Sequence, residues 1–381
     1  MSLPCSDNSL FIGLMSGTSL DGVDGVLAAF SSDPSQEAID TLAAAYVPFT
    51  TELQRDLMAL QSAGNNEIHR EALVANILAH CYADCVNQLL AQANIAADRV
   101  CAIGVHGQTI RHQPAFGYTR QTNNPALLAE LTGVDVIADF RGRDIAAGGQ
   151  GAPLVPAFHQ ALFADENESR VVINIGGISN ISVLGNEKAA HVIGFDTGPG
   201  NALMDTWIAR HLNKKYDAEG TWAASGEIIP RLLAALQDEP FFALPPPKST
   251  GRDLFNPAWL ADKLVGFSEA KPADVQATLA ALTATTLADA IAKYANSAKT
   301  AYVCGGGAYN TYLMRKLQQA LADHGLSAAV ESTSALGIPP NNVEALAFAW
   351  LAHRFIERKP GNLPTVTGAK GSRILGALYP S

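Results

Sequence analysis

Residues 10–30 read LFIGLMSGTSLDGVDGVLAAF, which is two apolar runs joined by a short segment of small polar residues. The runs are Leu10–Leu14 and Gly22–Phe30, and the joining segment is Met15–Asp21. This pattern predicts a β-hairpin with a polar turn. Residues 171–184, VVINIGGISNISVL, repeat the arrangement later in the chain around a glycine-rich turn. Two such hairpins, each opening an α/β unit, predict a duplicated architecture.

Four further apolar runs each lead into a polar or glycine-rich cluster. They are Val100–Val105 before 106–109, Val134–Ala138 before 139–144, Val192–Phe195 before 196–201, and Ala301–Cys304 before 305–308. In open α/β sheets, ligands bind at the carboxyl ends of the strands. The clusters therefore predict a ligand site that is assembled from several separate segments of an α/β fold.

The length of 381 residues corresponds to roughly two to three domains at about 150 residues each. We expect a first domain over residues 1–137, with the tail 360–381 as a candidate addition to it. We expect a second domain over residues 138–359. This second domain carries Asp196 and the glycine turn that begins at Gly305.

The charge balance and the cysteines exclude several classes of protein. The chain has 26 Lys and Arg against 36 Asp and Glu, a net charge of −10. We therefore expect neither nucleic acid nor an anionic membrane surface as a partner, because both attract basic proteins. Five scattered cysteines form no disulfide framework and fit a reducing compartment. The N-terminus has no signal-peptide pattern, and residues 145–164 are a poor membrane span, so we expect a soluble, cytoplasmic protein.

One long helix is expected over Ile68–Leu90, where apolar side chains recur at helical spacing. The recurring positions are Leu73, Ile77, Cys81, Cys85 and Leu89. We expect Cys81 and Cys85 to be buried apolar side chains rather than metal ligands. The sequence has no Walker A, His-Glu-x-x-His, Cys-x-x-Cys or Gly-x-Ser-x-Gly motif, and Lys248-Ser-Thr lacks the upstream glycine of a P-loop.

Asp196 is the candidate catalytic residue. It follows an apolar run and precedes Gly198-Pro-Gly200, so we expect its carboxylate to project from the end of a strand. A carboxylate in that position suits a general base. The alternative is that Asp196 forms a turn and Asn201 caps the helix expected over 202–212.

Three glycine-rich turns are candidates for holding phosphate. The first, Gly17-Thr-Ser-Leu-Asp-Gly22, can surround phosphate oxygens with backbone amides and hydroxyls. Asp21 in this turn can hold Mg²⁺ through water, because the ion prefers carboxylate oxygens and keeps much of its hydration. The other two turns are Gly176–Asn180 and Gly305–Ala308. A nucleotide held between two domains requires several such turns, although the first turn alone is equally an ordinary hairpin turn.

Polar side chains after two strands, and one at a helix start, are candidates for binding a sugar. His106 and Gln108 can hydrogen-bond hydroxyl groups, or they can be structural. Arg141 and Asp144 follow another strand, and an arginine there can grip a carboxylate with two parallel hydrogen bonds. The alternative for these two is a surface ion pair. Glu344 opens a helix, where it is either a cleft carboxylate or a favourable charge at the helix N-terminus.

Six segments carry the most specific patterns. They are FIGLMSGTSLDGVD (11–24), GVHGQTI (104–110), DFRGRDIAAGGQGAPLVP (139–156), NIGGISNI (174–181), GFDTGPGNALMD (194–205) and VCGGGAYN (303–310). In this order they resemble the anhydro-N-acetylmuramic acid kinase family, from about residue 10 to the tail. The resemblance implies an α/β fold of two related actin-like, ribonuclease-H-like ATPase domains that flank a nucleotide and sugar cleft.

The resemblance also implies a reaction and its residues. Water opens the 1,6-anhydro ring of anhydro-N-acetylmuramic acid, and ATP with Mg²⁺ phosphorylates O6, which yields N-acetylmuramic acid 6-phosphate and ADP during peptidoglycan recycling. Asp196 matches the catalytic aspartate of the family. The residues expected to bind ATP are Gly17, Thr18, Ser19, Leu20, Asp21, Gly22, Val23, Asp24, Gly176, Gly177, Gly305, Gly306 and Gly307. The residues expected to bind the sugar are His106, Gln108, Arg141, Asp144 and Glu344.

Two other functions share these turns. A phosphatase or polyphosphate hydrolase of the same superfamily needs the phosphate turns but no sugar site. A non-catalytic ATP-dependent sugar sensor binds ATP without turnover, and such sensors often carry a DNA-binding helix-turn-helix that is not evident here. We expect ATP and an amino sugar as partners, and alanine-rich helix surfaces permit a homodimer.

Overall fold

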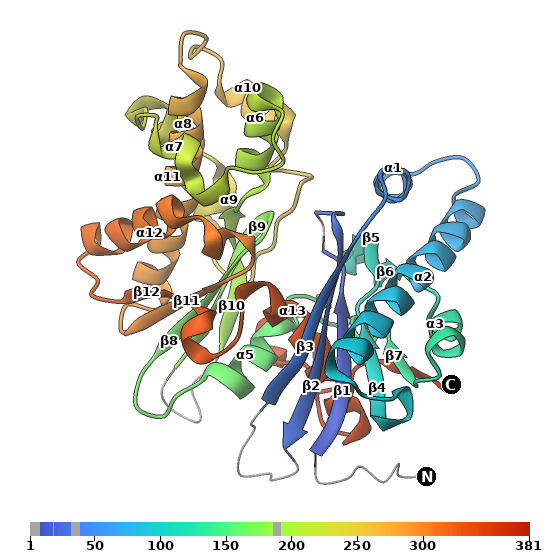
Figure 1. Ribbon diagram of the computed structural model, residues 1–381. Helices are drawn as coiled ribbons and strands as arrows, with labels where there is room; N and C mark the ends of the chain where they lie inside the picture. Colours follow the sequence, from blue (N-terminus) through green and yellow to red (C-terminus); the bar gives the residue numbers. More distant parts are fainter. Residues whose placement is uncertain (1–7, 18, 32–38, 186–191) are drawn as a thin grey trace. The chain divides into compact units, whose positions relative to one another are not determined.

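The computed structural model describes residues 8–17, 19–31, 39–185 and 192–381 (Figure 1). Contacts within the chain divide it into two compact units. Unit 1 comprises residues 1–162 and 341–381, and unit 2 comprises residues 163–340. Each unit is built around one main sheet with helices, which confirms the predicted α/β class.

The main sheet of unit 1 has six strands in the order β13-β7-β4-β1-β2-β3. Their bounds are β1 Asn8–Met15, β2 Gly22–Ser31, β3 Ile39–Pro48, β4 Val100–Val105, β7 Val136–Ala138 and β13 Ala377–Tyr379. Strands β1, β2 and β3 are antiparallel neighbours, whereas β4 is parallel to β1 and β7 is parallel to β4. The first predicted hairpin is confirmed, because β1 pairs with β2 in a register that places Leu14 opposite Gly25.

Side chains of β1 alternate between the two faces of this sheet, because successive residues of a strand point to opposite sides. Leu14 joins the core that contains side chains of α2 (Glu67–Ala93). Gly13 faces α13 (Val343–Ile356), where an added Cβ would lie 1.8 Å from the carbonyl oxygen of Ala345. Helix α13 therefore packs with its backbone directly against β1, and only glycine fits there.

The other helices of unit 1 are short. They are α1 Thr51–Ala59, α3 Pro125–Thr132, α4 Gly142–Ala146, α5 Val155–Phe163 and α14 Pro364–Thr367, with 3₁₀ turns η1 Ala97–Arg99 and η2 Pro114–Phe116 and a small hairpin of β5 Gln108–Gln113 and β6 Tyr118–Thr122. Two of them begin at side-chain caps: Thr50 accepts from the N–H of Leu53, and Asn124 accepts from the N–H of Leu127. Such caps satisfy N–H groups that a helix start leaves unpaired.

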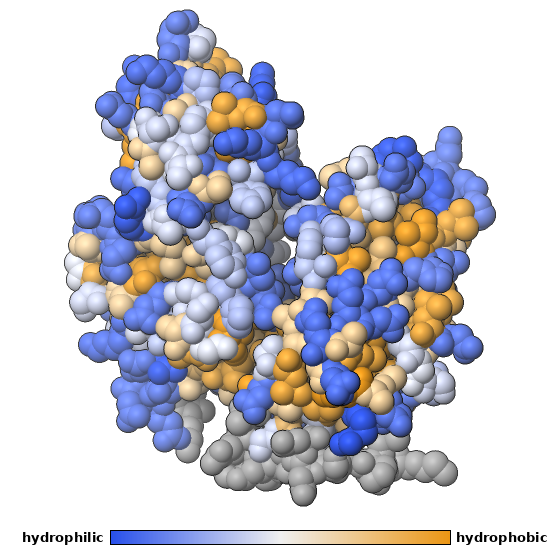
Figure 2. Space-filling view, viewed as in Figure 1, coloured by the Kyte–Doolittle hydropathy of each residue, from blue (hydrophilic) through white to orange (hydrophobic). Residues whose placement is uncertain are grey.

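The apolar face predicted for α2 is wrong at its first positions. Leu73 and Ile77 are 51% and 46% exposed, whereas Cys85 and Leu89 are buried. The buried face begins instead at Val74. Steps of four residues drift by about 40° each around a helix with 3.6 residues per turn, so a strict four-residue series leaves the core face. Figure 2 shows apolar surface over α2 and α3.

Unit 2 repeats the strand order of unit 1. Its sheet has the order β10-β9-β8-β11-β12, which corresponds to β3-β2-β1-β4-β7. The bounds are β8 Arg170–Ile175, β9 Ile178–Leu184, β10 Ile193–Pro199, β11 Thr300–Cys304 and β12 Ala329–Ser332. The first three strands are antiparallel, and β11 and β12 are parallel additions. The second hairpin and the predicted duplication are therefore confirmed.

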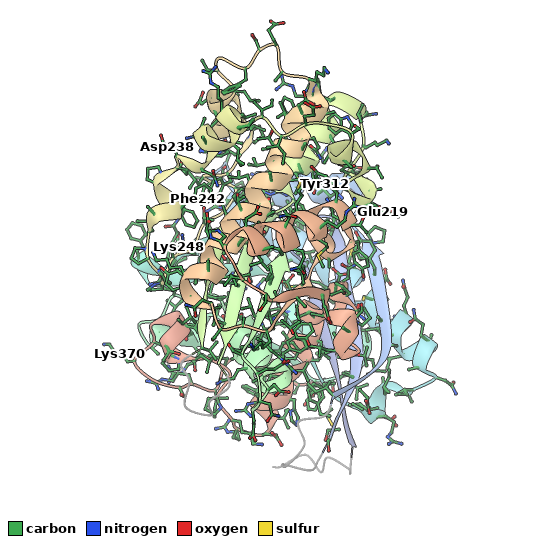
Figure 3. All side chains as sticks on the ribbon, turned by 90° about the vertical axis from the view of Figure 1, so that its left-hand side faces the viewer. Glu219, Asp238, Phe242, Lys248, Tyr312 and Lys370 are labelled. Atoms are coloured by element: carbon green, nitrogen blue, oxygen red, sulfur yellow. The ribbon has the colours of Figure 1, made fainter. Side chains whose placement is uncertain are left out.

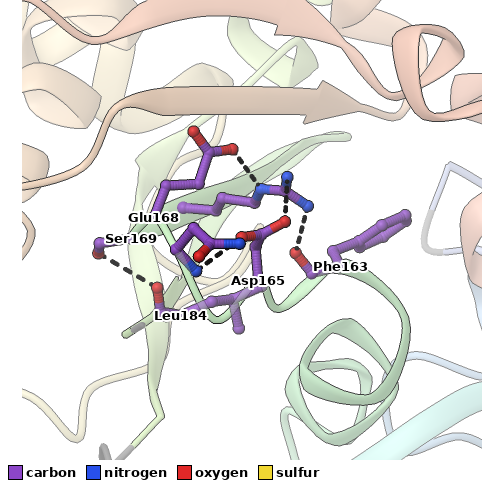
Figure 4. Close-up of polar contacts among 7 residues, drawn as sticks. Phe163, Asp165, Glu168, Ser169 and Leu184 are labelled. Carbon is purple, nitrogen blue, oxygen red and sulfur yellow. Dashed lines mark hydrogen bonds and ion pairs between the residues drawn. The ribbon is translucent and has the colours of Figure 1, made fainter. Parts of the chain in front are cut away.

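Arg170 fixes the start of unit 2 (Figure 4). Its guanidinium donates to Asp165 at 2.9 Å, to Glu168 at 2.7 Å and to the carbonyl oxygen of Phe163 at 3.1 Å. Ser169 donates its hydroxyl to the carbonyl oxygen of Leu184 at 3.2 Å. These bonds hold the chain that enters β8 against the end of β9.

Helix α11 (Pro272–Tyr294) is the central helix of unit 2. It is the one helix in the described part of the chain that is long and apolar enough to cross a membrane, and 83% of its most apolar window is buried. That burial is typical of a core helix. The other elements are α6 Ala202–Leu212, α7 Thr221–Ala224, α8 Pro230–Gln237, α9 Pro240–Ala243, α10 Pro257–Lys263 and α12 Thr311–Asp323, with 3₁₀ turns η3 Ala218–Gly220, η4 Gly306–Tyr309, η5 Thr333–Leu336 and η6 Pro340–Asn342.

The units divide the chain differently from the predicted domains 1–137 and 138–359. Residues 138–162 and helix α13 lie in unit 1. Strand β7 pairs with both β4 and β13, which ties the following segment and the tail to the first sheet. Helix α13 packs on β1 and β4, where Gly13 and Gly104 leave room for its backbone. These contacts join segments that are distant in sequence, so local patterns do not reveal the division.

Candidate active site

The turn between β1 and β2 is the first candidate phosphate site. Ser19 donates its hydroxyl to Oδ1 of Asp21 at 2.6 Å, and the N–H of Leu20 donates to the carbonyl oxygen of Gly17 at 3.2 Å. Leu20 has a φ of 58°, in the left-handed region. The result is a tight turn that exposes Ser19 and Asp21. Thr18, which was also expected to bind ATP, lies outside the described residues.

Two buried side chains support this turn. The hydroxyl oxygens of Ser16 and Tyr82 are 2.8 Å apart, and Tyr82 is fully buried on α2. Gln108 donates from Nε2 to the carbonyl oxygen of Gly17 at 3.0 Å. Its buried Oε1 has no hydrogen-bond partner among the residues that the structure describes. Gln108 therefore positions the turn, and its Oε1 remains an acceptor for the expected contact with the sugar.

Three residues expected to bind ATP, Gly22, Val23 and Asp24, are the first residues of β2. A Cβ on Gly22 would lie 2.5 Å from the carbonyl oxygen of Val47, so only glycine fits. The side chain of Val23 is fully buried in the core, so it is not available to a ligand. Only Asp24 of these three offers a side chain for chemistry.

Arg141 and His106 are joined directly. Arg141 donates from Nε to Nε2 of His106 at 3.0 Å and from Nη1 to the carbonyl oxygen of Gly151 at 2.8 Å. Burial lowers the pKa of His106 well below its usual range, with a further contribution from the charge of Arg141, so the ring is neutral. We therefore assign its proton to Nδ1, which is buried without an acceptor among the described residues. An unpaired buried donor costs about 1–3 kcal/mol, so it marks a position for a ligand or a water molecule.

Half-buried acidic side chains lie near this pair. Burial raises the pKa of Asp24 to about 7, and the charges of Asp21 and Glu344 contribute. Burial also raises the pKa of Glu344, against the charge of Arg141. Burial lowers the pKa of Arg141 to about 10, which leaves it charged at neutral pH. Acids with perturbed pKa values beside a half-buried cation are typical of functional sites.

Asp144 does not have the arrangement expected of a sugar ligand. Its side chain is 0% exposed. Its carboxylate accepts hydrogen bonds from the N–H of Gly151 and from the side chains of Asn362 and Thr367. The expected substrate contact is therefore replaced by a structural role, because the tail of the chain occupies the positions around this carboxylate.

Asp196 was expected to follow a strand. It lies instead inside β10, which spans Ile193–Pro199. The register of β10 with β9 shifts between Asp196 and Gly198, as at a β-bulge or a similar irregularity. Bulges redirect side chains and are frequent beside active sites. The N–H of Thr250 donates to Oδ2 of Asp196 at 2.9 Å. Burial raises the pKa of Asp196 to about 6, while the Thr250 N–H and the charge of Lys248 oppose the shift.

Lys248 is a further residue beside Asp196 that the sequence did not identify as a site candidate. Its Nζ donates to the carbonyl oxygens of Phe241 and Phe242 at 3.1 and 3.2 Å, and Lys248 and Phe242 lie side by side (Figure 3). Its own carbonyl oxygen accepts from the N–H of Asp196 at 3.2 Å. Lys248 therefore connects the end of α9 to the base candidate. The proline run before it signals only a loop, so no local pattern identifies this role.

The second glycine turn, at Gly176 and Gly177, is held against the start of α6. The N–H of Asn201 donates to the carbonyl oxygen of Gly176 at 2.8 Å, and the N–H of Gly200 donates to the carbonyl oxygen of Gly177 at 2.9 Å. The side chain of Asn201 donates to the carbonyl oxygen of Ile175 at 3.0 Å and makes no capping bond. The alternative in which Asn201 caps α6 through its side chain is therefore wrong.

The third turn, Gly305 to Gly307, follows β11 and requires glycine. Gly305 has a φ of 75°, and an added Cβ would lie 2.4 Å from Oδ1 of Asn174. A Cβ on Gly307 would lie 2.3 Å from the side chain of Ile175. A Cβ on Gly306 would make only ordinary van der Waals contact, 3.7 Å from Nδ2 of Asn201. The third turn therefore packs against the start of the second turn within unit 2.

Metal binding was predicted only at Asp21. Within the described ranges, no group of three or more His, Cys, Asp or Glu side chains is placed to hold a metal ion. Mg²⁺ needs fewer protein ligands, because it is usually bound through one or two carboxylates while it keeps several waters. The exposed carboxylate of Asp21 and the hydroxyl of Ser19 supply the oxygen donors that this ion prefers.

The duplicated strand order, with a hairpin opening each unit, is that of the predicted actin-like, ribonuclease-H-like fold. The sequence model of the family described as anhydro-N-acetylmuramic acid kinase matches residues 9–381. The chain belongs to this family, and it is an enzyme, a phosphotransferase. The resemblance carried by the six segments is thereby confirmed.

Individual relatives agree with the family match. The chain is 58% identical over 373 residues to the anhydro-N-acetylmuramic acid kinase of Burkholderia cenocepacia, across 98% of this chain and 97% of that protein. It is 58% identical over 374 residues to the protein of the same name from Paraburkholderia xenovorans, across 98% of each. Among solved structures, the activator of the 2-hydroxyisocaproyl-CoA dehydratase from Clostridium difficile with bound ADPNP aligns at 11% identity and a TM-score of 0.49, over 92% of this chain and 96% of that chain.

Proposed function

We propose that this enzyme opens the 1,6-anhydro ring of 1,6-anhydro-N-acetylmuramic acid with water and phosphorylates O6 with ATP. The products are N-acetylmuramic acid 6-phosphate and ADP. The observation that carries the proposal is the half-buried carboxyl group of Asp196, with a pKa raised to about 6 and one oxygen bound by the N–H of Thr250. A general base is most efficient when its pKa lies near the working pH.

In this reaction Asp196 takes a proton from water as the water oxygen attacks C1 of the sugar. The C1–O6 bond breaks, and its electron pair remains on O6. O6 then attacks the γ-phosphorus of ATP, and ADP leaves with the electrons of the broken phosphoanhydride bond. Asp196 finally releases its proton to solvent. The first half matches the role of the water-activating base in an inverting glycosidase.

Arg141, His106 and Glu344 are the proposed sugar ligands in unit 1. Arg141 donates hydrogen bonds from two of its nitrogens, to His106 and to Gly151, and these bonds fix the plane of its guanidinium. A fixed guanidinium recognises a carboxylate with specific geometry. The lactyl carboxylate of the substrate is such a group. The unpaired Nδ1–H of His106 and the Oε1 of Gln108 supply a donor and an acceptor for neutral groups of the sugar.

The three glycine-rich turns are the proposed ATP contacts. Ser19 and Asp21 are exposed at the first turn, and at the other two turns Gly177 and Gly306 are the glycines where an added Cβ would meet no atom closer than 3.7 Å. Backbone N–H groups at such turns suit phosphate oxygens. Asp21 would hold Mg²⁺ through water, and the bound ion neutralises phosphate charge. Cys81 and Cys85, which form no disulfide, support a cytoplasmic location, where the product enters the recycling of cell-wall amino sugars.

The test is an ADP-release assay with the anhydro sugar, with N-acetylmuramic acid, and without sugar, run in ¹⁸O-water. We expect ADP only with the anhydro sugar, and one heavy oxygen at C1 of the sugar phosphate by mass spectrometry. ADP without sugar would instead identify a phosphatase or other hydrolase. ATP binding without any ADP would identify a sensor. Phosphorylation of the anhydro sugar without incorporation of ¹⁸O would contradict the coupled ring opening.

A further inference from the structure

Asp144 connects three separate parts of unit 1. Its Oδ1 accepts from Nδ2 of Asn362 at 2.6 Å and from the hydroxyl of Thr367 at 2.8 Å. Its Oδ2 accepts from the N–H of Gly151 at 2.8 Å. The carboxylate, Asn362 and Thr367 are all buried. A buried carboxylate is unfavourable without such partners, so loss of any one of them weakens the whole arrangement.

The tail segment 362–370 is also bound to the loop 147–151 through the backbone. The N–H of Gln150 donates to the carbonyl oxygen of Thr367 at 2.8 Å. The N–H of Lys370 donates to the carbonyl oxygen of Ala147 at 2.9 Å. The loop contains three glycines, which have little conformational preference of their own. Its conformation therefore depends on a segment that follows it by more than 200 positions.

Gly151 links this arrangement to the proposed sugar site. Its N–H is held by Asp144, while its carbonyl oxygen accepts from Nη1 of Arg141 at 2.8 Å. It has a φ of 68°, and an added Cβ would lie 2.8 Å from the side chain of Ile145, so the position requires glycine. Arg141 in turn donates to Nε2 of His106 at 3.0 Å. The two backbone groups of this one residue thus connect the position of the tail to the guanidinium.

We propose that Asp144, Asn362 and Thr367 are positioning residues, through which the tail sets the geometry of Arg141 for the anionic group of the sugar. The inference rests on the proposed function, because it assigns Arg141 to substrate binding. The tail then contributes to sugar affinity without contacting the sugar. Binding of ATP at the turn between β1 and β2 does not depend on this chain of bonds.

The test compares Thr367→Val with Thr367→Ser in the full-length enzyme. Valine has the shape of threonine but no hydroxyl to donate to Asp144, whereas serine retains it. We expect Thr367→Val to raise KM for the anhydro sugar by about tenfold, with KM for ATP changed less than about twofold. Thr367→Ser should behave as wild type. Lys370→Ala is the matched control on the same segment, because its side chain is exposed and its backbone bond is retained (Figure 3).

A second readout does not depend on activity. Hydrogen exchange measured by mass spectrometry on peptides that cover residues 142–158 should be faster in Thr367→Val than in wild type or Thr367→Ser. If Thr367→Val does not fold, Asn362→Ala removes a different bond to Asp144 and is examined in the same way. Unchanged exchange together with an unchanged KM for the sugar would overturn the inference, as would an equal rise in both KM values. Failure of the wild-type enzyme to turn over the anhydro sugar would contradict the proposed function instead, and faster exchange would still support the link between tail and loop.

Discussion

The N–H of Thr250 lies 2.9 Å from Oδ2 of Asp196, although the two residues are 54 positions apart. A second bond, from the N–H of Asp196 to the carbonyl oxygen of Lys248 at 3.2 Å, joins the same two segments. The Thr250 donor favours the ionised carboxylate, while burial favours the neutral acid. The balance leaves Asp196 half-buried with a pKa of about 6, so the carboxylate is mostly ionised at neutral pH, which is the state that a base for water activation requires.

Asp196→Asn should abolish most of the sugar turnover and leave the fold intact. Asparagine has the same shape and cannot accept the proton from water, so we expect kcat to fall by about 10²–10⁴-fold. ATP affinity, measured by calorimetry, should stay the same. Asp253→Asn, on an exposed position of the loop that carries Thr250, is the matched control and should be active. Near-normal turnover of Asp196→Asn would remove this residue from the mechanism.

The pH dependence of kcat/KM should show an acid limb governed by Asp196. Only the ionised carboxylate acts as a base, so activity falls as the pH drops through about 6, the pKa of this group. The charge of Lys248 lowers the pKa of Asp196. Lys248→Met should therefore move the limb to higher pH, whereas Lys248→Arg should keep it near the wild-type position. An unmoved limb in Lys248→Met would show that the lysine does not influence the base.

Asp24→Asn should stabilise the fold more at pH 8 than at pH 4. Burial raises the pKa of Asp24 from 3.8 to about 7, so the folded state keeps a proton that the unfolded chain releases. The free energy of unfolding therefore falls as the pH rises between these values, and it stays lower above pH 7. Because one pKa unit equals about 1.4 kcal/mol, we expect a gain above ~1 kcal/mol at pH 8. Urea unfolding at both pH values measures it, and an equal effect at both would contradict the assignment.

Gly13→Ala should disrupt the contact between β1 and α13. The added Cβ would lie 1.8 Å from the carbonyl oxygen of Ala345, and a helix backbone cannot yield as a flexible side chain can. We expect a loss of about 3 kcal/mol or more in the free energy of unfolding. Gly117→Ala is the control, since its φ of 77° is strained for alanine but no atom lies within 4 Å. That variant should lose only about 1–2 kcal/mol. Equal losses in the two variants would contradict the packing described here.

Arg141→Lys should weaken sugar binding selectively. Lysine keeps the positive charge but not the planar group that contacts both His106 and Gly151. We expect KM for the sugar to rise by about tenfold to a hundredfold, with little change in KM for ATP. Arg143→Lys, two positions along and exposed, serves as the control. An unchanged KM for the sugar would show that Arg141 does not bind it.

Local patterns predicted the parts of the fold that local chemistry controls. The hairpin at residues 10–30 follows from apolar runs and a polar turn, and both are visible in consecutive residues. The predictions that were wrong concern features that depend on tertiary packing. Leu73 and Ile77 have the spacing of a buried face, but the position of the sheet decides which side of α2 is covered. Asp144 has a side chain that can bind a sugar, but Asn362 and Thr367 of the tail donate hydrogen bonds to its carboxylate.

The sequence by itself determined the α/β class, the duplication, the family and the residue types available for catalysis, because each of these is encoded in short segments. Only the tertiary structure decided which polar groups remain available to a substrate. His106 and Asp144 come from equally polar clusters of the sequence. The Nδ1–H of His106 has no partner among the described residues, whereas the carboxylate of Asp144 is hydrogen-bonded within the protein. They differ because a buried polar atom must find a partner, and only the folded chain shows whether the protein itself supplies one.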